Sequence, residues 1–344
     1  MLFRVDFAVA ILFFSINNVS AQFDTTYYVK YPDMLGLGVF QAIRNNSIEL
    51  ERIGINSVPN YIKYNTNGKG VTGFVFAYDK IYLAFGFKIQ SNEEAKKGKS
   101  KNTNLVLQLN GNKLVLEAAY RNYKGFYEEN TPLFIPSFND TTPYYQDENL
   151  RNKIWKLKAF YFFNHKKFSY NAAYFGTFRQ IKSASSWVLN ANFYTGNIRS
   201  DSSMIPYYAQ EIFNPYSYLN GISVIGFSFG GGGSGNIVVF KKFIFNATLT
   251  AGLEPQWRTY DIINEEKISQ TFLSAALDFR SSFGFNSERF FFLVSTINDF
   301  TFNYNKSLMV TGNFLTTSFV LGYRFHFENK ATHWLKQNKI YKMI

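Results

Sequence analysis

The feature that most constrains this chain is a strict alternation of side chains along Leu315–Phe327, near its end. Odd positions there are mostly large and apolar and end in aromatic residues, whereas even positions are small, polar or basic. Because neighbouring side chains of a strand point to opposite faces, this stretch predicts a strand with one apolar and one polar face. The same alternation recurs about a dozen times, which is typical of transmembrane β-barrels.

We therefore expect an all-β fold, a single antiparallel outer-membrane β-barrel of about 12 strands over residues 70–327. Counting Ser47–Ile53 and Tyr61–Tyr64 as further strands gives the alternative of about 14, and both counts are even, as single-chain bacterial barrels require. Residues 22–69 otherwise predict an extended or plug-like segment, and residues 328–344 a C-terminal tail. The predicted strands are Gly70–Tyr78, Ile81–Ile89, Asn104–Asn110, Lys113–Tyr123, Lys153–Phe163, Phe168–Thr177, Ser186–Asn197, Gly221–Phe240, Phe243–Glu254, Ser269–Arg280, Arg289–Asn303 and the final stretch.

Two long polar loops fit this count poorly. If the last strand ends in the periplasm, counting backwards places Arg199–Leu219 outside the cell but Glu128–Leu150 in the periplasm, where barrel turns are short. Either one strand is miscounted, for example at the glycine run Gly230–Gly235, or the barrel has an atypical periplasmic loop. The glycine run itself predicts a bent strand where another backbone or a plug packs closely, or a turn, because no Lys-Ser/Thr pair or helix follows it as in a phosphate-binding loop.

Composition agrees with a membrane barrel. Aromatic residues make up 19% of the chain, which lipid and the interfacial girdles of a barrel can accommodate. Mean hydropathy is only −0.16, as expected when half of each strand faces a polar lumen. No apolar run approaches the roughly 20 residues that a spanning helix needs.

The first 21 residues predict a secretory signal peptide. Arg4 supplies the positive charge, Phe7–Ile16 the apolar region and Val19–Ala21 a cleavage site before Gln22. The chain has no cysteine, hence no lipidation site and no disulfide. We expect the outer membrane of a Gram-negative bacterium as the location.

The last strand also resembles the C-terminal signal of barrel proteins, through Gly322, Tyr323, Phe325 and Phe327. That resemblance implies the barrel-assembly machinery as a partner during insertion, although the chain continues beyond the last aromatic. The formal net charge of +12 would suit nucleic acid, but the secretion signal argues against it. Outer-membrane lipid and lipopolysaccharide are better-placed partners, with other outer-membrane proteins as further candidates.

Charged side chains on the polar faces are the candidate functional residues. The bases are Lys80, Lys88, Lys113, Arg121, Lys156, Lys158, Arg280 and Arg324, and the acids are Glu117, Glu254, Asp278 and Asp299. Rings of Lys and Arg favour anions in a pore. The alternative is a narrow lumen filled by ion pairs, since 12 strands enclose far less space than the porins of about 16–18 strands.

No cofactor, metal site or catalytic residue is expected. The three histidines, His165, His326 and His333, lack metal-ligand spacing, and a lipid hydrolase would need a serine beside a histidine on the lipid-facing wall. The leading hypothesis is a non-enzymatic barrel, a pore or binding protein for a small solute with a bias toward anions. The alternatives are a structural or interaction subunit of an outer-membrane assembly, which would dock through its long loops, and an outer-membrane lipid hydrolase.

Several stretches resemble a bacterial family catalogued only as a domain of unknown function, number 4421. Its early motifs are NSIEL at Asn46–Leu50, the strand pair Gly70–Phe87, LVLQL at Leu105–Leu109 and YRNYKGFYEEN at Tyr120–Asn130. Later ones are Lys166–Ser169, Arg179–Ala184, Ser200–Pro206 and Val239–Lys242. The resemblance implies an outer-membrane barrel of Bacteroidota-type bacteria, but no reaction, ligand or functional residue.

Overall fold

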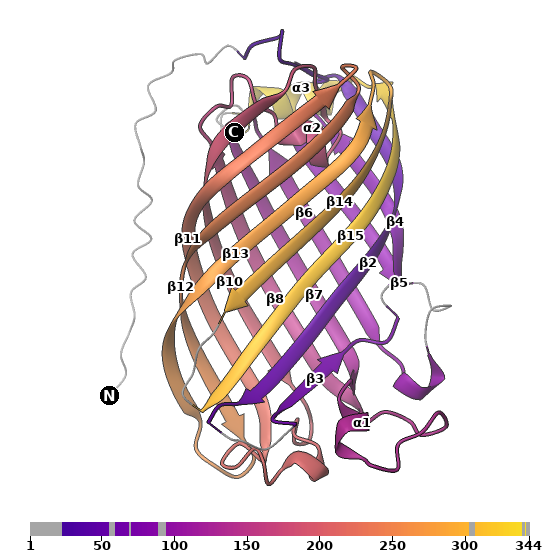
Figure 1. Cartoon of the computed structure of the whole chain (residues 1–344). Coiled ribbons are helices and arrows are strands. Elements are labelled where there is room, and N and C mark those ends of the chain that lie inside the picture. The colour runs from indigo at the N-terminus through magenta and orange to yellow at the C-terminus, as the bar shows by residue number, and fades with distance from the viewer. Residues whose placement is uncertain are drawn as a thin grey trace.

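The computed structural model describes residues 23–54, 59–68, 70–88, 94–302, 307–338 and 341, and these form a closed antiparallel β-barrel (Figure 1). The predicted signal peptide lies outside the described residues. Twelve strands make up the wall: β2 (Met34–Arg52), β4 (Gly70–Tyr78), β5 (Ile81–Lys88), β6 (Lys101–Asn110), β7 (Leu114–Glu128), β8 (Gln146–Phe162), β10 (Ala184–Arg199), β11 (Leu219–Val239), β12 (Phe243–Ile262), β13 (Ile268–Asn286), β14 (Phe290–Phe302) and β15 (Leu308–His326).

The strand count of 12 is confirmed, but two of the assignments behind it are wrong. Met34–Arg52 is not a segment apart from the barrel, because β2 pairs with β15 along its whole length and closes the wall. Phe168–Thr177 is not a wall strand but lies inside the barrel end. The short β3 (Tyr61–Asn65) continues the ladder on β2 beyond the point where β4 begins.

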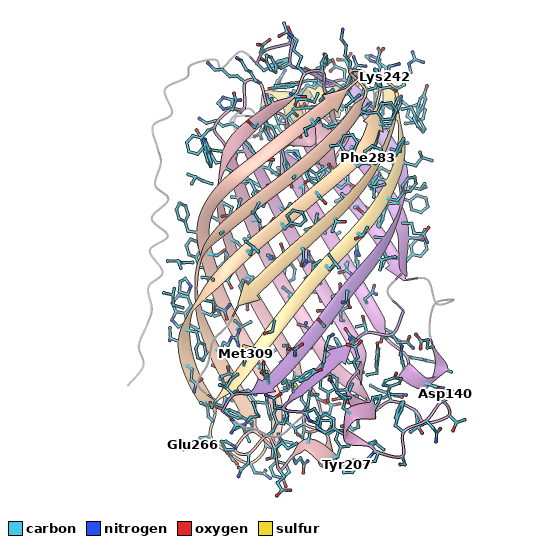
Figure 2. All side chains as sticks on the ribbon, in the orientation of Figure 1. Asp140, Tyr207, Lys242, Glu266, Phe283 and Met309 are labelled. Atoms are coloured by element: carbon cyan, nitrogen blue, oxygen red, sulfur yellow. The ribbon has the colours of Figure 1, made fainter. Side chains whose placement is uncertain are left out.

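When Met34–Arg52 is counted as a wall strand and Phe168–Thr177 is not, both long polar loops fall at the same end of the barrel. Met34 and His326 lie at one end of the barrel, called the terminal end below, together with the tight turns (Figure 1). Residues 129–145 and 200–218 both lie at the opposite end, called the loop end, as Asp140 and Tyr207 show in Figure 2. Apart from residues 163–183, which connect β8 to β10, the connections at the terminal end are short, and short turns at one end with long loops at the other are usual in bacterial barrels.

The wall is apolar outside and polar inside. In β12 the alternation is nearly perfect, and it was predicted for Phe243–Glu254. Its outward residues Phe245, Leu249 and Leu253 are exposed, whereas its inward residues Asn246, Thr248 and Glu254 are buried. The other strands repeat this pattern, and Figure 2 shows Phe283 on the outside of the wall. A water-soluble sheet would bury the opposite face.

The glycine run lies in the middle of β11, as the strand interpretation predicted. A Cβ atom at Gly232 would lie 1.9 Å from the carbonyl oxygen of Leu249 on β12. Only glycine therefore permits the close approach of these two strands.

The C-terminal tail folds against the terminal end. Its helix α3 (Lys330–Gln337) begins at an Asn329 capping box, and Lys336 forms an ion pair with Asp33, just before β2. Tyr341 donates a hydrogen bond of 2.8 Å to Asp79 in the β4–β5 turn, and burial raises the pKa of Asp79. No helix among the described residues is long and apolar enough to cross a membrane.

Candidate functional site

At the terminal end, residues 163–183 fold into the mouth of the barrel. This segment, called the terminal plug below, contains α2 (Asn171–Tyr174) and β9 (Phe178–Gln180), and β9 pairs with β1 (Tyr28–Lys30). Its apolar side chains pack in one buried cluster with residues of the wall; those from the plug are Phe168, Tyr170, Ala172, Ala173, Tyr174, Phe175 and Phe178. The plug thus fills this end of the lumen with apolar material.

Arg324, one of the predicted lumen bases, holds the terminal plug in place. Its Nε donates a hydrogen bond of 2.6 Å to the carbonyl oxygen of Gly176 in the plug. Its other nitrogens donate to Ser287 O at 2.7 Å and to Asn286 Oδ1 at 2.7 Å. Asn286 in turn donates to the carbonyl oxygens of Ala172 and Phe178 at 3.0 and 2.8 Å. Side chains of β13 and β15 therefore donate hydrogen bonds to backbone carbonyl groups of the terminal plug.

The loop end is closed by residues 200–218, called the loop plug below. Met204, Ile205, Phe213 and Tyr216 of this segment are buried in a second apolar cluster. Tyr64 of β3 donates a hydrogen bond of 2.6 Å to the carbonyl oxygen of Met204. Both ends of the described barrel are therefore filled by its own loops.

Between the plugs, six charged side chains form a network across the lumen. Asp278 and Asp299 lie opposite each other on β13 and β14, where like charges repel. Lys158 reaches from β8 and contacts both carboxylates, and Lys156 contacts Asp299 at 2.7 Å.

Arg280 extends this network to the far wall and to the plug. Its guanidinium lies 2.9 Å from Asp278 and 3.3 Å from Glu117 of β7, and it donates a hydrogen bond of 2.9 Å to Tyr170 of the terminal plug. Three bases thus balance three acids, so the network bridges the lumen without adding net charge.

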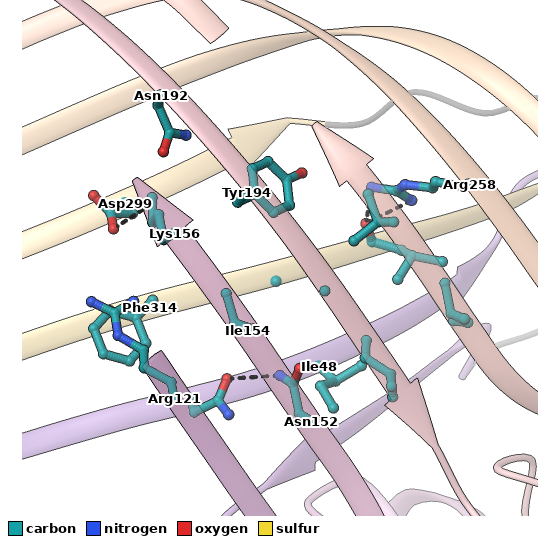
Figure 3. A pocket seen from close by; sticks show the side chains of 17 residues that line it. Ile48, Arg121, Asn152, Ile154, Lys156, Asn192, Tyr194, Arg258, Asp299 and Phe314 are labelled. Carbon is teal, nitrogen blue, oxygen red and sulfur yellow. Dashed lines mark hydrogen bonds and ion pairs between the residues drawn. The ribbon is translucent and has the colours of Figure 1, made fainter. Parts of the chain in front are cut away.

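Two of the cavities in the described lumen lie on either side of Arg121. The loop-side cavity, of about 130 Å³, is lined by residues of β2, β7, β8, β10, β11, β12, β14 and β15, among them Lys156, Tyr194 and Arg258 (Figure 3). The terminal-side cavity, of about 110 Å³, lies between the wall and Tyr174 and Phe175 of the terminal plug. Arg121 and Phe314 line both cavities and separate them.

Arg121 lies beside the network without a direct ion pair among the described residues. Its guanidinium carbon lies 3.4 Å from the ring centroid of Phe314, a cation–π contact that Figure 3 shows as two stacked side chains. The residue is only 7% exposed. Among the described residues it forms no hydrogen bond or ion pair, whereas every acid of the network already has a partner.

Arg44 of β2 adds a second unpaired guanidinium to the terminal-side cavity. Its Nη1 is buried without a hydrogen-bond partner among the described residues, and the hydroxyl of Thr316 on the same cavity wall is likewise unpartnered there. Burying such donors without an acceptor costs about 1–3 kcal/mol each, more for charged groups. The terminal-side cavity therefore presents unused donors and positive charge.

Six of the twelve predicted lumen charges belong to the network, and the other six lie elsewhere in the chain. Glu254 binds Tyr194 instead, at 3.1 Å. Lys80 and Lys113 lie in turns at the terminal end, not in the lumen, where Lys80 donates to Tyr341 O at 2.6 Å and Lys113 lies over the ring of Tyr161. Lys88 ends β5, and its side chain lies outside the described part of the structure.

Sequence reasoning missed two lumen bases. Arg44 lies in β2, whose alternation is weakened by Asn45, Asn46 and Ser47. Arg258 lies in β12 beyond Pro255, where the predicted strand had already ended; its Nε donates to Gln256 at 2.9 Å. The alternation of β12 could have identified Arg258, because the even-numbered residues of that strand point inward and Arg258 continues their series.

His165 belongs to the terminal plug, where its carbonyl oxygen accepts a hydrogen bond of 2.9 Å from the Tyr28 hydroxyl. His326 is largely exposed at the barrel mouth, 3.9 Å from Glu328. No group of three side chains suited to hold a metal ion occurs among the residues that the structure describes.

Comparison with solved structures gives distant similarities to bacterial barrels. The outer-membrane protease OmpT from Escherichia coli has 8% identity and a TM-score of 0.37, with 86% of this chain and 98% of that chain covered. The translocator domain of autotransporter NalP from Neisseria meningitidis has 10% identity and a TM-score of 0.30, covering 86% and 89%. The P. putida toluene transporter TodX has 10% identity and a TM-score of 0.24, covering 87% and 91%. Values this low transfer no activity, ligand or partner.

A search among curated proteins found no match. A family model, in contrast, matches residues 22–325, nearly the whole described barrel. The match spans every stretch on which the resemblance rested. The chain therefore belongs to the family described as Domain of unknown function (DUF4421).

Proposed function

We propose that the protein is an outer-membrane barrel that binds a small anion inside its lumen and has no permanently open pore. The observation that carries the proposal is Arg121, a guanidinium buried between two cavities with no carboxylate in direct contact among the described residues. A buried charge needs a counter-charge or hydrogen-bond acceptors. With Arg44 beside it, an anion from solution satisfies both guanidinium groups.

The two plugs support binding over free passage. The cavities of about 130 and 110 Å³ lie between plugs whose apolar side chains are buried. The charge network also spans the lumen between them. The sequence left two alternatives for the lumen, an anion-favouring pore and an interior filled by ion pairs. The charge network corresponds to the second alternative. The unpaired bases beside the network support binding of an anion.

The surface supports the proposed location. Exposed Leu, Ile, Val and aromatic side chains cover the outer wall, and such an apolar band is what a bilayer requires of a spanning barrel. The interaction-subunit hypothesis relied on long loops as docking surfaces. The apolar residues of the Arg199–Leu219 loop in the loop plug are instead buried, although Tyr207 and Tyr218 of the same loop are exposed.

The test is anion binding by the purified protein in detergent, measured by isothermal titration calorimetry with acetate, nitrate, sulfate and phosphate. We expect at least one of these anions to bind. Arg121→Met is expected to weaken that binding about tenfold or more, because a hydrogen bond to a charged group contributes about 1.5–3 kcal/mol.

Lys242→Met is the matched control, since Lys242 is an exposed base in the β11–β12 turn, and we expect unchanged affinity. Absence of binding for every anion, or equal affinity in the Arg121 and Lys242 variants, would overturn the proposal. A thermal unfolding curve for each variant separates loss of the site from loss of the fold.

A further inference from the structure

We infer that the terminal-side cavity selects a short aliphatic carboxylate over inorganic anions. The inference rests on the proposed function and names the chemical class of its ligand. It follows from how the polar and apolar residues of this cavity are ordered along the barrel axis.

The end of the cavity nearer the loop plug is cationic and polar. β2 runs from the terminal end to the loop end, so Arg44 lies nearer the loop end than Ala42 and Phe40 do. β15 runs the other way, and Thr316 accordingly precedes Val320. Arg121, which forms the partition to the loop-side cavity, completes this end.

The opposite end of the cavity is lined mostly by apolar side chains, together with the hydrogen-bonded pair Gln108 and Glu117, which lie nearer the terminal end than Arg121 does. It is bounded by Phe40, Ala42 and Val320 of the wall and by Phe175 of the terminal plug, all of which belong to one buried apolar cluster. Ala84 of β5 lines the same cavity and packs against this cluster. A ligand that fills the cavity therefore needs a charged head and an apolar tail.

A carboxylate meets the first requirement because it accepts hydrogen bonds from a guanidinium in a planar, paired arrangement. Sulfate or phosphate would turn further charged oxygens toward the apolar end, where they lose water without gaining partners. Glu117 also lines the cavity and is paired with Arg280. Its negative charge disfavours a doubly charged anion more than a singly charged one.

The volume sets the length of the tail. A cavity of about 150 Å³ holds benzene, which has six carbon atoms. The terminal-side cavity has about 110 Å³, which on that scale corresponds to about four to five non-hydrogen atoms, so propionate matches the volume and butyrate is the first acid that exceeds it.

The experiment is a calorimetric titration of the wild-type protein with acetate, propionate, butyrate, inorganic phosphate and the neutral butyramide. Each methylene that the cavity buries is expected to tighten binding about fourfold, so propionate binds about fourfold more tightly than acetate, and butyrate at least as tightly as propionate. Phosphate and butyramide are expected to bind at least tenfold more weakly than butyrate. This comparison requires no variant and is therefore independent of effects on folding.

Two variants locate the ligand. Ala84→Leu fills the apolar end and is expected to abolish the preference for butyrate over acetate while acetate still binds. Arg44→Gln is expected to weaken all carboxylates about tenfold, and Lys242→Met to change nothing.

The outcomes separate the two proposals. If phosphate binds as tightly as butyrate, or if Ala84→Leu keeps the preference for butyrate, the carboxylate inference is wrong but anion binding stands. If butyramide equals butyrate, the charge is not recognised and both fail. If no anion binds, water alone fills the cavity and both fail.

Discussion

Individual lumen residues divide into charges that are paired across the barrel and charges that are not. Lys158 belongs to the first class, because it stands between two carboxylates that face each other on neighbouring strands. Arg121 and Arg44 belong to the second. Composition could not distinguish these classes, since both consist of bases on inward positions of strands; only the three-dimensional arrangement shows which base meets an acid.

Replacing Lys158 by methionine is expected to lower the free energy of unfolding by about 3–5 kcal/mol, because it leaves Asp278 and Asp299 buried with one base fewer between them. Urea unfolding in lipid vesicles measures the change. The control Lys241→Met, at an exposed turn, is expected to stay within about 0.5 kcal/mol of wild type. A loss in the Lys158 variant no larger than in the control would mean that the network does not stabilise the barrel.

At the level of elements, alternation located nearly all wall strands but misassigned one segment. Phe168, Tyr170, Ala172 and Tyr174 alternate with polar or small residues, as a strand would, yet they belong to the terminal plug. Inside a barrel a segment is enclosed on all sides, so apolar residues are buried without lining a wall. Met34–Arg52 was missed for the opposite reason: several polar residues interrupt its outward face, although its hydrogen bonds close the barrel.

Arg324→Leu is expected to loosen the terminal plug, because it removes hydrogen bonds to Gly176 and to the β13–β14 turn. In planar bilayers we expect the wild type to show no ion conductance and this variant to show intermittent openings. Arg289→Leu, an exposed arginine in the same turn, is the control and is expected to remain silent. If the Arg324 variant shows no ion conductance and has normal thermal stability, apolar packing alone is sufficient to retain the terminal plug.

For the whole molecule, sequence reasoning predicted the architecture, the strand number and the inside-out distribution of side chains, because a period of two is a local property. It could not predict the plugs or the partition at Arg121 and Phe314, since these depend on contacts between segments far apart in the chain. Arg121 and Phe314 lie on β7 and β15, and no spacing in the sequence relates them.

The apolar outer face of the wall leads to a prediction about the position of the bilayer. Leu249 lies mid-strand on the outer face of β12 and is 51% exposed. Leu249→Arg is expected to cost about 2–4 kcal/mol of folding free energy in a bilayer, the typical penalty at the midplane. Phe240→Arg, at a hairpin tip where Phe240 is 84% exposed, is the control, with an expected cost of about 0–1 kcal/mol near the interface. Equal costs at both positions would contradict a bilayer around the middle of β12.

The pairing of the first and last wall strands has a consequence for the order of folding. The ladder from Met34 to Arg52 on β2 cannot form until β15, near the end of the chain, has been made. The same late strand carries Arg324, which grips the terminal plug. Non-local pairings of this kind form late because they must first overcome loop-closure entropy. Closure of the wall and attachment of the terminal plug therefore depend on the same strand, so that a defect in β15 would open the barrel and release the plug together.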